Sequence, residues 1–412
     1  MRTLLIHQVF VSPREAGGTR HFELGSHVVR SGHEFTIVAS SLSYLTGSKA
    51  PAASSPEEFG GIRVLRAYTY PALHRSFLWR VISFLSFMLS SVWSALRAGP
   101  VDVVMGTSPP IFQAASAWFV AAIRRKPFLL EIRDLWPEFA IDMGVLKNRF
   151  LIVMSRWLER FLYARATRIL VNSPAYRDYL IAMSVNPAKI DHIPNGVDPD
   201  MFVPEAKGEN IRMEYDLGDR FVAVYAGALG RANDLPTLLR AAERLKGDTN
   251  IVFLIVGDGM ERPMLESWVG EKKLTNVLFT GAQPKARMSD FLAAADVCLA
   301  TLQAIPMFKT TYPNKVFDYM AAGRATLLGI DGVIRSVMEQ SGGGVFVPPG
   351  DPEAMADAVV RMRDDPARVR AMGLSARAYV VRHFNRKEHA ERFVRLLVSM
   401  TADRVAREEP CH

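Results

Sequence analysis

Cysteine is nearly absent from this 412-residue sequence, which holds two, Cys298 and Cys411, far apart along the chain. Two isolated cysteines supply neither a disulfide framework nor a cysteine-based metal site. We therefore expect the protein to work in a reducing compartment, the cytoplasm.

Several catalytic signatures are absent as well. The sequence contains no G-x-x-x-x-G-K-[ST], H-E-x-x-H, G-x-S-x-G or C-x-x-C pattern. Their absence argues against a P-loop kinase or ATPase and against the hydrolases and redox proteins that carry the other patterns. Gly257-Asp258-Gly259 begins like a dinucleotide fingerprint, but Arg262 occupies the position of the third glycine, so a nicotinamide enzyme is weakly supported.

No concentrated tract of Lys and Arg occurs, although 50 basic residues outnumber 42 acidic ones and give a net charge of +8. This pattern disfavours a dedicated nucleic-acid-binding protein. Residues 1–200 carry 22 basic and 15 acidic side chains, whereas residues 201–412 carry 28 and 27. The basic first half favours contact with phosphates or a lipid surface, although an idle, solvated excess of charge explains the same numbers.

Apolar segments of strand length alternate with helical segments, and turns separate them. Such alternation is typical of α/β folds, in which helices cover both faces of a parallel sheet. The expected strands are 4–11, 35–39, 62–67, 101–105, 128–132 and 168–171, and, after a restart near 190–200, 221–225, 251–256, 276–280, 297–300 and 325–329. We predict two doubly wound, Rossmann-like domains, 1–192 and 193–380, and a C-terminal helical segment, 381–412, that packs back on the first domain.

The segment Phe77–Leu96 has the length of a membrane-spanning helix and a single charge, Arg80. Its apolar residues form a helical stripe, and five serines dilute the rest. A spanning helix at this place would separate the strands before it from those after it, so we favour either a core helix or a helix on the membrane surface. Arg75 and Arg97 at its flanks suit the membrane-surface alternative.

The segment Met307–Gly323 is the richest in features that suggest phosphate and sugar handling. Pro313-Asn314 is expected to open a helix, whose free N–H groups and positive dipole end attract anions. Lys309 and Lys315 flank this end, so a diphosphate could bind there, and Asp318 one turn later could accept hydrogen bonds from sugar hydroxyls. An ordinary structural helix with exposed Asp and Lys residues is an equally good interpretation of the spacing alone.

Two further loops follow predicted strands of the first half. Gly17-Gly18 comes between the first strand and a helix, where a ligand could approach the backbone closely, although a plain tight turn would look the same. Arg133 and Asp134 follow the strand 128–132, and charged residues at the carboxyl end of a parallel strand point towards the ligand crevice. A salt-bridged strand end is the alternative.

Taken in order along the chain, these pieces match one family. The sequence resembles the family 4 retaining glycosyltransferases of the GT-B fold that build bacterial O-antigen, capsule or exopolysaccharide. The motifs that carry the resemblance are Gly17-Gly18, Gly32-His33-Glu34, Asn172-Ser173, Pro194-Asn195-Gly196-Val197-Asp198, Val256-Gly257-Asp258-Gly259, Ala294-Ala295-Asp296-Val297 and Tyr319-Met320-Ala321-Ala322-Gly323. The segments EIRDLWPE and YPNKVFDYMAAG look closest to N-acetylfucosamine-type transferases.

The resemblance implies a nucleoside-diphosphate sugar, with UDP as the expected nucleotide, in the second domain and an acceptor in the first. No metal or other cofactor is required. The implied donor-binding residues are Gly17, Gly18, Arg231, Gly257, Gly259, Lys309, Thr310, Thr311, Tyr312, Asn314 and Asp318. Asp134, Lys315 and Asp318 are the expected catalytic residues.

The sequence departs from the family pattern at several of these positions. Thr310 and Asp318 stand where the family has two glutamates, and Ala228 and Asn233 stand where cations usually hold the diphosphate. Arg231, Lys309 or Lys315 could replace those cations. Arg133 takes the place of a common histidine.

The predicted activity is retaining transfer of a hexosyl or amino-sugar group to a polyprenyl-diphosphate-linked glycan at the inner face of the cytoplasmic membrane. The changed site positions leave two alternatives open, a non-catalytic scaffold in polysaccharide assembly and a UDP-sugar epimerase on the same fold.

Overall fold

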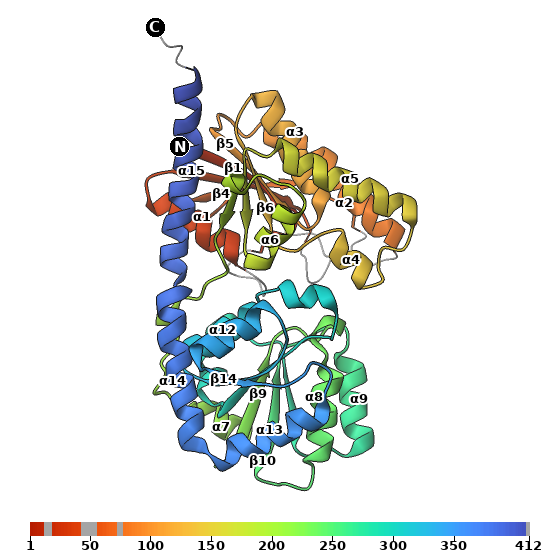
Figure 1. The fold of residues 1–412 in the computed structure, drawn as a ribbon, viewed down its shortest axis with the longest axis vertical. Coiled ribbons are helices and arrows are strands. Elements are labelled where there is room, and N and C mark those ends of the chain that lie inside the picture. Colours follow the sequence, from red (N-terminus) through yellow and green to blue (C-terminus); the bar gives the residue numbers. More distant parts are fainter. Residues whose placement is uncertain (12–18, 43–55, 72–76, 409–412) are drawn as a thin grey trace. The chain divides into compact units, whose positions relative to one another are not determined.

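The computed structural model describes residues 1–11, 19–42, 56–71 and 77–408. The chain divides into two compact units, which we call the N-terminal unit (1–194 and 387–412) and the C-terminal unit (195–386). Each unit is built around one sheet with helices on both faces (Figure 1), so the predicted α/β class is confirmed.

The sheet of the N-terminal unit has the strand order β3-β4-β2-β1-β5-β6-β7-β8. Its strands are β1 (Arg2–Ile6), β2 (Glu34–Ser40), β3 (Glu57–Phe59), β4 (Ile62–Ala67), β5 (Val103–Ser108), β6 (Phe128–Ile132), β7 (Arg168–Val171) and β8 (Ile190–His192). All pairs are parallel except β3 with β4. The chain builds outward from β1 in one direction and from β5 in the other, so the carboxyl ends of β1 and β5 form the crevice where ligands of such sheets bind.

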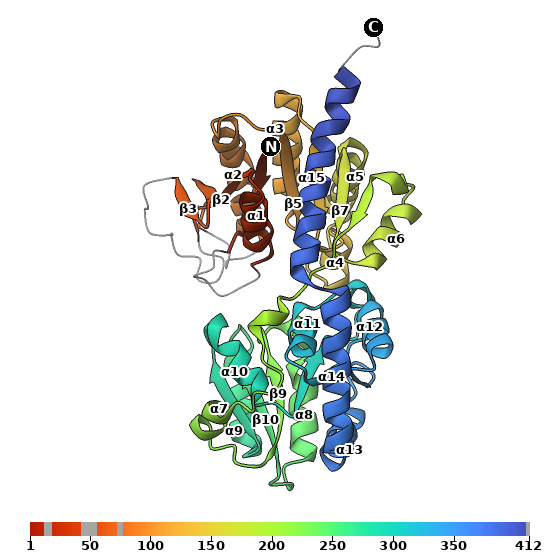
Figure 2. The ribbon, with the colours of Figure 1, turned by 90° about the vertical axis from the view of Figure 1, so that its left-hand side faces the viewer.

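Helices cover both faces of this sheet (Figures 1 and 2). They are α1 (Arg20–Arg30), α2 (Phe77–Leu96), α3 (Ile111–Arg124), α4 (Glu138–Asp142), α5 (Arg149–Arg165), α6 (Pro174–Ala182) and α15 (Arg386–Glu408). Val28 of α1 and Phe393 and Leu397 of α15 share one buried core with Leu5 and Met105 of the sheet. The last helix of the chain is therefore part of the N-terminal unit.

The sheet of the C-terminal unit is parallel throughout, with the order β11-β10-β9-β12-β13-β14. Its strands are β9 (Phe221–Ala226), β10 (Ile251–Val256), β11 (Val277–Gly281), β12 (Val297–Thr301), β13 (Ala325–Gly329) and β14 (Gly344–Phe346). The helices are α7 (Glu209–Glu214), α8 (Leu235–Arg244), α9 (Arg262–Lys272), α10 (Met288–Ala293), α11 (Asn314–Ala321), α12 (Val333–Ser341), α13 (Pro352–Asp364) and α14 (Pro366–His383). The order reverses between β9 and β12, which places the second ligand crevice at their carboxyl ends.

Most predicted elements agree with the structure, and the differences occur at strand ends. The predicted strands 62–67, 128–132, 168–171, 251–256 and 325–329 and the helix 77–96 have the bounds expected. The first strand ends at Ile6 rather than Val11, and the strand predicted at 101–105 spans Val103–Ser108. The short strands β3, β8 and β14 were not predicted. Within the described ranges, no helix combines the length and apolar character needed to cross a bilayer.

Candidate functional site

The side chain of Lys315, in the first turn of α11, reaches the carboxyl end of β9. Its Nζ donates hydrogen bonds to the hydroxyl of Tyr225 at 2.8 Å and to Oδ1 of Asn233 at 2.7 Å. The amine also lies 4.3 Å from the centre of the Tyr225 ring. A Cβ at Gly227 would stand 3.2 Å from Nζ. A lysine therefore occupies the crevice between β9 and β12.

The surroundings of this lysine are neutral. Burial of the amine lowers the pKa of Lys315 to about 7, because removal from water disfavours the charged form and its two hydrogen-bond partners carry no negative charge. Burial likewise raises the pKa of the Tyr225 phenol, so that partner stays neutral. An anion placed at this amine would supply the missing counter-charge and restore the ammonium.

Two glycine-containing turns pack against each other beside Lys315. A Cβ at Gly257 would come within 1.9 Å of the Gly227 carbonyl oxygen, and one at Gly259 within 2.4 Å of the Leu229 carbonyl oxygen. Leu229 N donates to the Asp258 carbonyl at 2.9 Å and thereby joins the turns after β9 and β10. Gly257 and Gly259, predicted to bind the donor, have a packing reason to be glycine.

The segment before α11 contains three more residues predicted to bind the nucleotide-sugar donor. Lys309 is exposed, and Asp331 neutralises it across 3.0 Å. Both line a pocket of about 320 Å³ after β12 and β13. The Thr310 hydroxyl donates to the Met307 carbonyl at 2.6 Å, whereas the buried Thr311 hydroxyl has no hydrogen-bond partner among the described residues.

The remaining residues predicted to bind the donor lie near the start of α11 or after β9. The ring of Tyr312 packs edge-on against Phe317 and Phe384, and burial raises the pKa of its phenol to about 12. Asn314, the first residue of α11, is exposed, Asp318 is half-buried one turn later, and Arg231 is exposed after β9. Gly17 and Gly18 lie outside the described residues.

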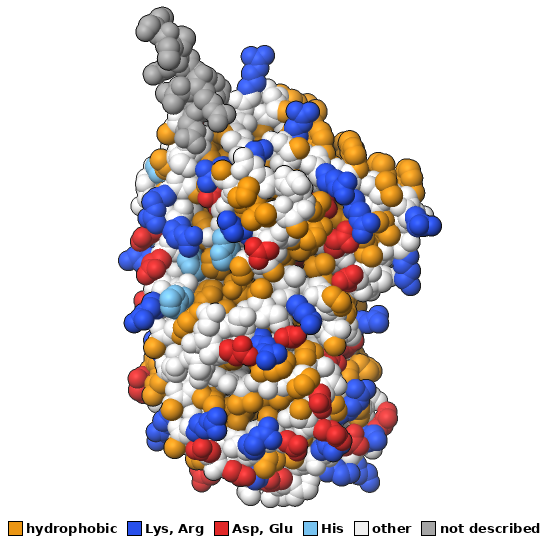
Figure 3. All heavy atoms as spheres, viewed as in Figure 1, with side chains coloured by type: hydrophobic (Ala, Val, Ile, Leu, Met, Phe, Trp, Pro, Cys, Tyr) orange, Lys and Arg blue, Asp and Glu red, His pale blue; other side chains and the backbone are white. Residues whose placement is uncertain are grey.

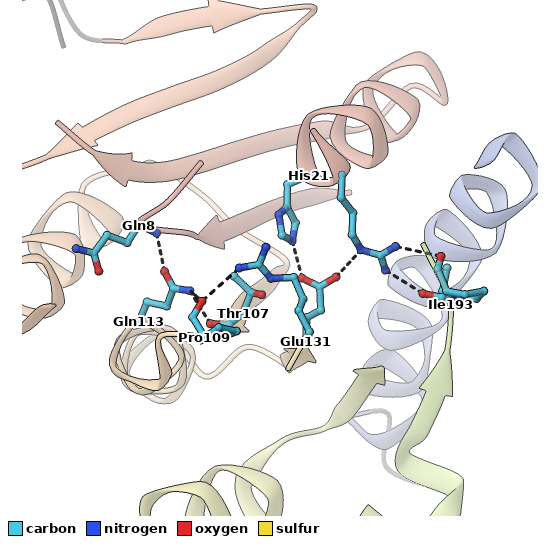
Figure 4. Close-up of polar contacts among 10 residues, drawn as sticks. Gln8, His21, Thr107, Pro109, Gln113, Glu131 and Ile193 are labelled. Carbon is cyan, nitrogen blue, oxygen red and sulfur yellow. Dashed lines mark hydrogen bonds and ion pairs between the residues drawn. The ribbon is translucent and has the colours of Figure 1, made fainter. Parts of the chain in front are cut away.

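A buried carboxylate forms the centre of the polar cluster in the N-terminal unit (Figure 4). Glu131, in β6, is fully buried, and its two oxygens contact His21 Nε2 at 2.5 Å and Arg20 Nε at 2.9 Å. Arg20 also donates to the carbonyls of Ile193 and Pro194. Burial alone would raise the pKa of Glu131, but His21 and Arg20 hold it well below its usual value.

Several buried polar atoms near this carboxylate have no hydrogen-bond partner among the described residues. They are both ring nitrogens of His7, Nε2 of Gln8 and Oγ1 of Thr107. The three residues follow β1 or belong to β5, and the His7 ring lies 4.4 Å from that of His21. Burial lowers the pKa of His7 well below its usual value, and the nearby His21 lowers it further. The crevice between β1 and β5 thus offers donors and acceptors for a polar ligand.

Asp134, predicted from its place after β6, is held in a partly desolvated site. Burial raises the pKa of its carboxyl to about 6, although Arg133 and the Tyr176 hydroxyl, 3.5 Å away, act in the opposite direction. Arg133 donates to the Pro109 carbonyl at 3.2 Å. The pKa of Asp134 thus lies closer to neutral pH than that of an ordinary aspartate.

Sequence comparisons identify both units. Residues 16–196 match the family model described as a glycosyl transferase 4-like domain, and residues 220–365 match the one described as glycosyl transferases group 1. The chain is a glycosyltransferase of the GT-B type. WbjE of Pseudomonas aeruginosa, named as a glycosyltransferase, is 28% identical over 274 residues, covering 65% of this chain and 68% of WbjE.

Two further proteins resemble this glycosyltransferase over more of its length. WcaI of Escherichia coli (strain K12), named for glycosyl transfer in colanic acid biosynthesis, is 24% identical over 332 residues, or 78% of this chain and 81% of WcaI. The crystal structure of Anabaena HepE in complex with UDP has a TM-score of 0.74 at 17% identity, covering 97% of this chain and all of HepE. The similarity to HepE shows that the two proteins share a fold.

The structure of this glycosyltransferase brings some predicted residues together and leaves others apart. Lys315 bonds to Asn233 in the turn after β9, and the Asn233 carbonyl accepts a 2.6 Å hydrogen bond from Thr301 at the end of β12. Lys309 is instead paired with Asp331. The sequence patterns missed Glu131, His21 and Arg20 as one cluster. The single acid inside the apolar strand FLLEI was the signal that could have found it.

The glycine contacts give a prediction for stability. Gly257→Ala should lower the free energy of unfolding by about 2–4 kcal/mol, because the backbone has φ +140° and the new Cβ would overlap the Gly227 carbonyl. Gly270→Ala in α9 is the matched control: its Cβ would meet open space, so a gain of about 0.5–1 kcal/mol is expected. Urea unfolding of the two variants measures both effects, and equal stabilities would contradict the packing reason.

Proposed function

We propose that this glycosyltransferase moves a sugar, with retention of anomeric configuration, from a UDP-sugar to a polyprenyl-diphosphate-linked glycan. The observation that carries the proposal is the position of Lys315. Its amine lies at the crevice of the C-terminal sheet, and the two groups that hold it there, Tyr225 and Asn233, are both neutral. A bound UDP-sugar would place its diphosphate at the Lys315 amine.

The chemistry follows from how charge moves during transfer. When the bond between the sugar and the diphosphate breaks, negative charge develops on the departing phosphate oxygen, and the Lys315 ammonium stabilises it. Tyr225 and Asn233 fix the direction of the amine, so little reorganisation is needed as the charge develops. The departing phosphate oxygen accepts the proton of the acceptor hydroxyl. No metal is needed in this scheme, since the chain itself supplies the cation.

In the N-terminal unit, the acceptor glycan would bind at the crevice between β1 and β5. His7, Gln8 and Thr107 have buried polar atoms there without hydrogen-bond partners among the described residues, and sugar hydroxyls would satisfy them. Asp134, with its pKa raised to about 6, would orient an acceptor hydroxyl by accepting its hydrogen bond.

The relatives support the choice of pathway and donor. The name of WcaI connects one relative with colanic acid biosynthesis, and HepE, with the same fold, was crystallised with UDP. O-antigen, capsule or exopolysaccharide synthesis at the inner face of the cytoplasmic membrane is the setting we propose. We propose that the transferred sugar is of the N-acetylfucosamine type, and a panel of nucleotide sugars tests this choice.

The low pKa of Lys315 predicts how UDP affinity depends on pH. A bound diphosphate favours the ammonium and raises the pKa of Lys315, so binding is coupled to proton uptake once the pH exceeds about 7. Between pH 7.5 and 9 the dissociation constant for UDP should rise by about tenfold per pH unit. Titration calorimetry measures it, and Lys315→Arg, which stays charged, should show a flat profile. Equal slopes for the two proteins would exclude Lys315 as the titrating group.

A donor panel tests the function itself. Binding of UDP-, GDP- and dTDP-sugars to the wild-type protein by calorimetry should single out a UDP-sugar. Binding of no nucleotide sugar would support a scaffold role instead. Conversion of the bound donor to an isomeric UDP-sugar in the absence of acceptor would support an epimerase.

A further inference from the structure

Helix α2 exposes several large apolar side chains to solvent, and two of its serines lie on the buried side together with Phe87 and Ala95. From residue 81 to 93 the exposed side chains are those of Ile82, Leu85, Leu89 and Trp93, with Leu89 70% and Trp93 60% exposed. On the opposite side Ser83 and Ser91 are fully buried, and the hydroxyl of Ser91 donates to the Met88 carbonyl. A surface helix of a soluble protein normally presents polar side chains to water.

Helix α5 also exposes large apolar side chains. Phe150, Val153 and Trp157 are 69%, 65% and 59% exposed, while Glu159 is buried and accepts a 2.7 Å hydrogen bond from the Tyr163 hydroxyl. Burial raises the pKa of Glu159 to about 7. The helix therefore exposes aromatic and aliphatic side chains to solvent, whereas its one acidic side chain is buried.

Helix α3 joins the other two into one surface. Its Ser116 donates to the Met88 carbonyl of α2, and its Trp118 packs edge-on against Phe161 of α5 with ring centres 4.6 Å apart. We call the exposed apolar residues of the three helices the apolar helical face: Trp79, Ile82, Leu85, Leu89, Trp93, Phe119, Ile123, Phe150, Leu151, Val153, Met154 and Trp157. Hydrophobic side chains gather at the edge of the N-terminal unit where α3 and α5 lie (Figure 3). A contiguous exposed patch of this kind marks a docking surface.

The charges of the three helices indicate what docks there. Together α2, α3 and α5 contain six arginines and one acid, the buried Glu159. Arg97, just after α2, stacks on the Trp93 ring at 3.8 Å, and Arg156 is paired with Glu138 of α4 at 2.7 Å. A second copy of this chain would bring arginines against arginines, whereas an anionic lipid surface complements them. Tryptophan, enriched where membranes meet water, fits the same occupant.

We propose that the apolar helical face inserts into the surface of a bilayer that contains anionic phospholipids and so attaches the protein to the membrane. The proposal fits the proposed function because the lipid-linked acceptor lies in such a bilayer. It is nevertheless tested separately, since neither donor nor acceptor is needed for docking.

Sedimentation with vesicles tests the docking. The full-length protein should bind vesicles of phosphatidylglycerol and phosphatidylethanolamine at least tenfold more tightly than vesicles of phosphatidylcholine, and 0.5 M NaCl should weaken the binding. Leu89→Glu and, independently, Trp157→Glu should each reduce the partition coefficient at least tenfold. Met213→Glu, at a methionine 74% exposed in the C-terminal unit, should leave it unchanged.

Circular dichroism and melting curves of the variants confirm that the exposed substitutions leave the fold intact. Equal vesicle binding by the wild type and both variants would overturn the proposal. So would a wild-type dimer in sedimentation equilibrium without lipid that Leu89→Glu converts to a monomer, because the face would then be covered by a second copy. If the protein binds vesicles but no UDP-sugar, the proposed function is refuted and the proposed docking surface is retained.

Discussion

Lys315→Met is expected to lower kcat/KM for the UDP-sugar by about 100- to 1000-fold, the size of effect seen when one preorganised donor to a developing negative charge is removed. The methionine keeps most of the side-chain length but carries no charge, so the departing diphosphate loses its cation. Steady-state transfer kinetics measures the loss. The melting temperature should change little, because the hydroxyl of Tyr225 still donates to the Ala228 carbonyl.

Lys272→Met provides the matched control. Lys272 lies on α9 of the same unit, about half exposed and 3.2 Å from Glu243, so its loss should leave the transfer rate within twofold of the wild type. Lys315→Arg should recover part of the activity by restoring the charge. A Lys315→Met protein as active as the Lys272→Met protein would remove Lys315 from the donor site.

Glu131→Ala should lower the free energy of unfolding by about 3–5 kcal/mol, because it leaves the Arg20 guanidinium, only 13% exposed, without its counter-charge. Urea unfolding of the full-length protein, followed by circular dichroism, measures the change. Glu138→Ala is the control, because that carboxylate pairs with the exposed Arg156 and its loss should cost about 1 kcal/mol or less.

The same carboxylate predicts a dependence of stability on pH. Because the pKa of Glu131 is lower in the folded protein than in the unfolded chain, its contribution is complete above about pH 4.5 and is lost as the pH falls through the folded value. The buried His7, whose pKa is also lowered, acts in the same direction below about pH 6.5. Wild-type stability should fall on acidification, and Glu131→Ala should fall less steeply below pH 4.5. Parallel curves below pH 4.5 would show that the Glu131 carboxylate is not the group responsible.

The fold could be predicted where local pattern decides structure. The strands FLLEI and IVFLIV are buried on both faces, and such strands appear in sequence as short apolar runs between turns. The strands β3 and β14 have three residues each, too few to show a period. His7 and Gln8 extend an apolar run in sequence but lie beyond the strand: their backbones still bond to β2, but the Gln8 N–H turns to the side chain of Gln113.

The candidate site could be predicted only in part, for a related reason. Lys315 was found because it stands beside the helix start at Pro313-Asn314, a local signal. Its partners Tyr225 and Asn233 lie 90 and 82 residues earlier, and such pairings depend on which strands become neighbours. The exposed apolar faces of α2 and α5 were hidden likewise, since a helical stripe alone does not tell which side meets the sheet.

Transfer of a labelled sugar into lipid tests the central claim most directly. The wild-type protein would be incubated with radiolabelled UDP-sugars and polyprenyl-diphosphate-linked glycan acceptors, and the label extracted into organic solvent counted. We predict that one UDP-sugar labels the lipid fraction and that Lys315→Met reduces the initial rate at least 100-fold. Label that stays in the aqueous phase with every donor, at wild-type concentrations that bind UDP, would contradict the claim.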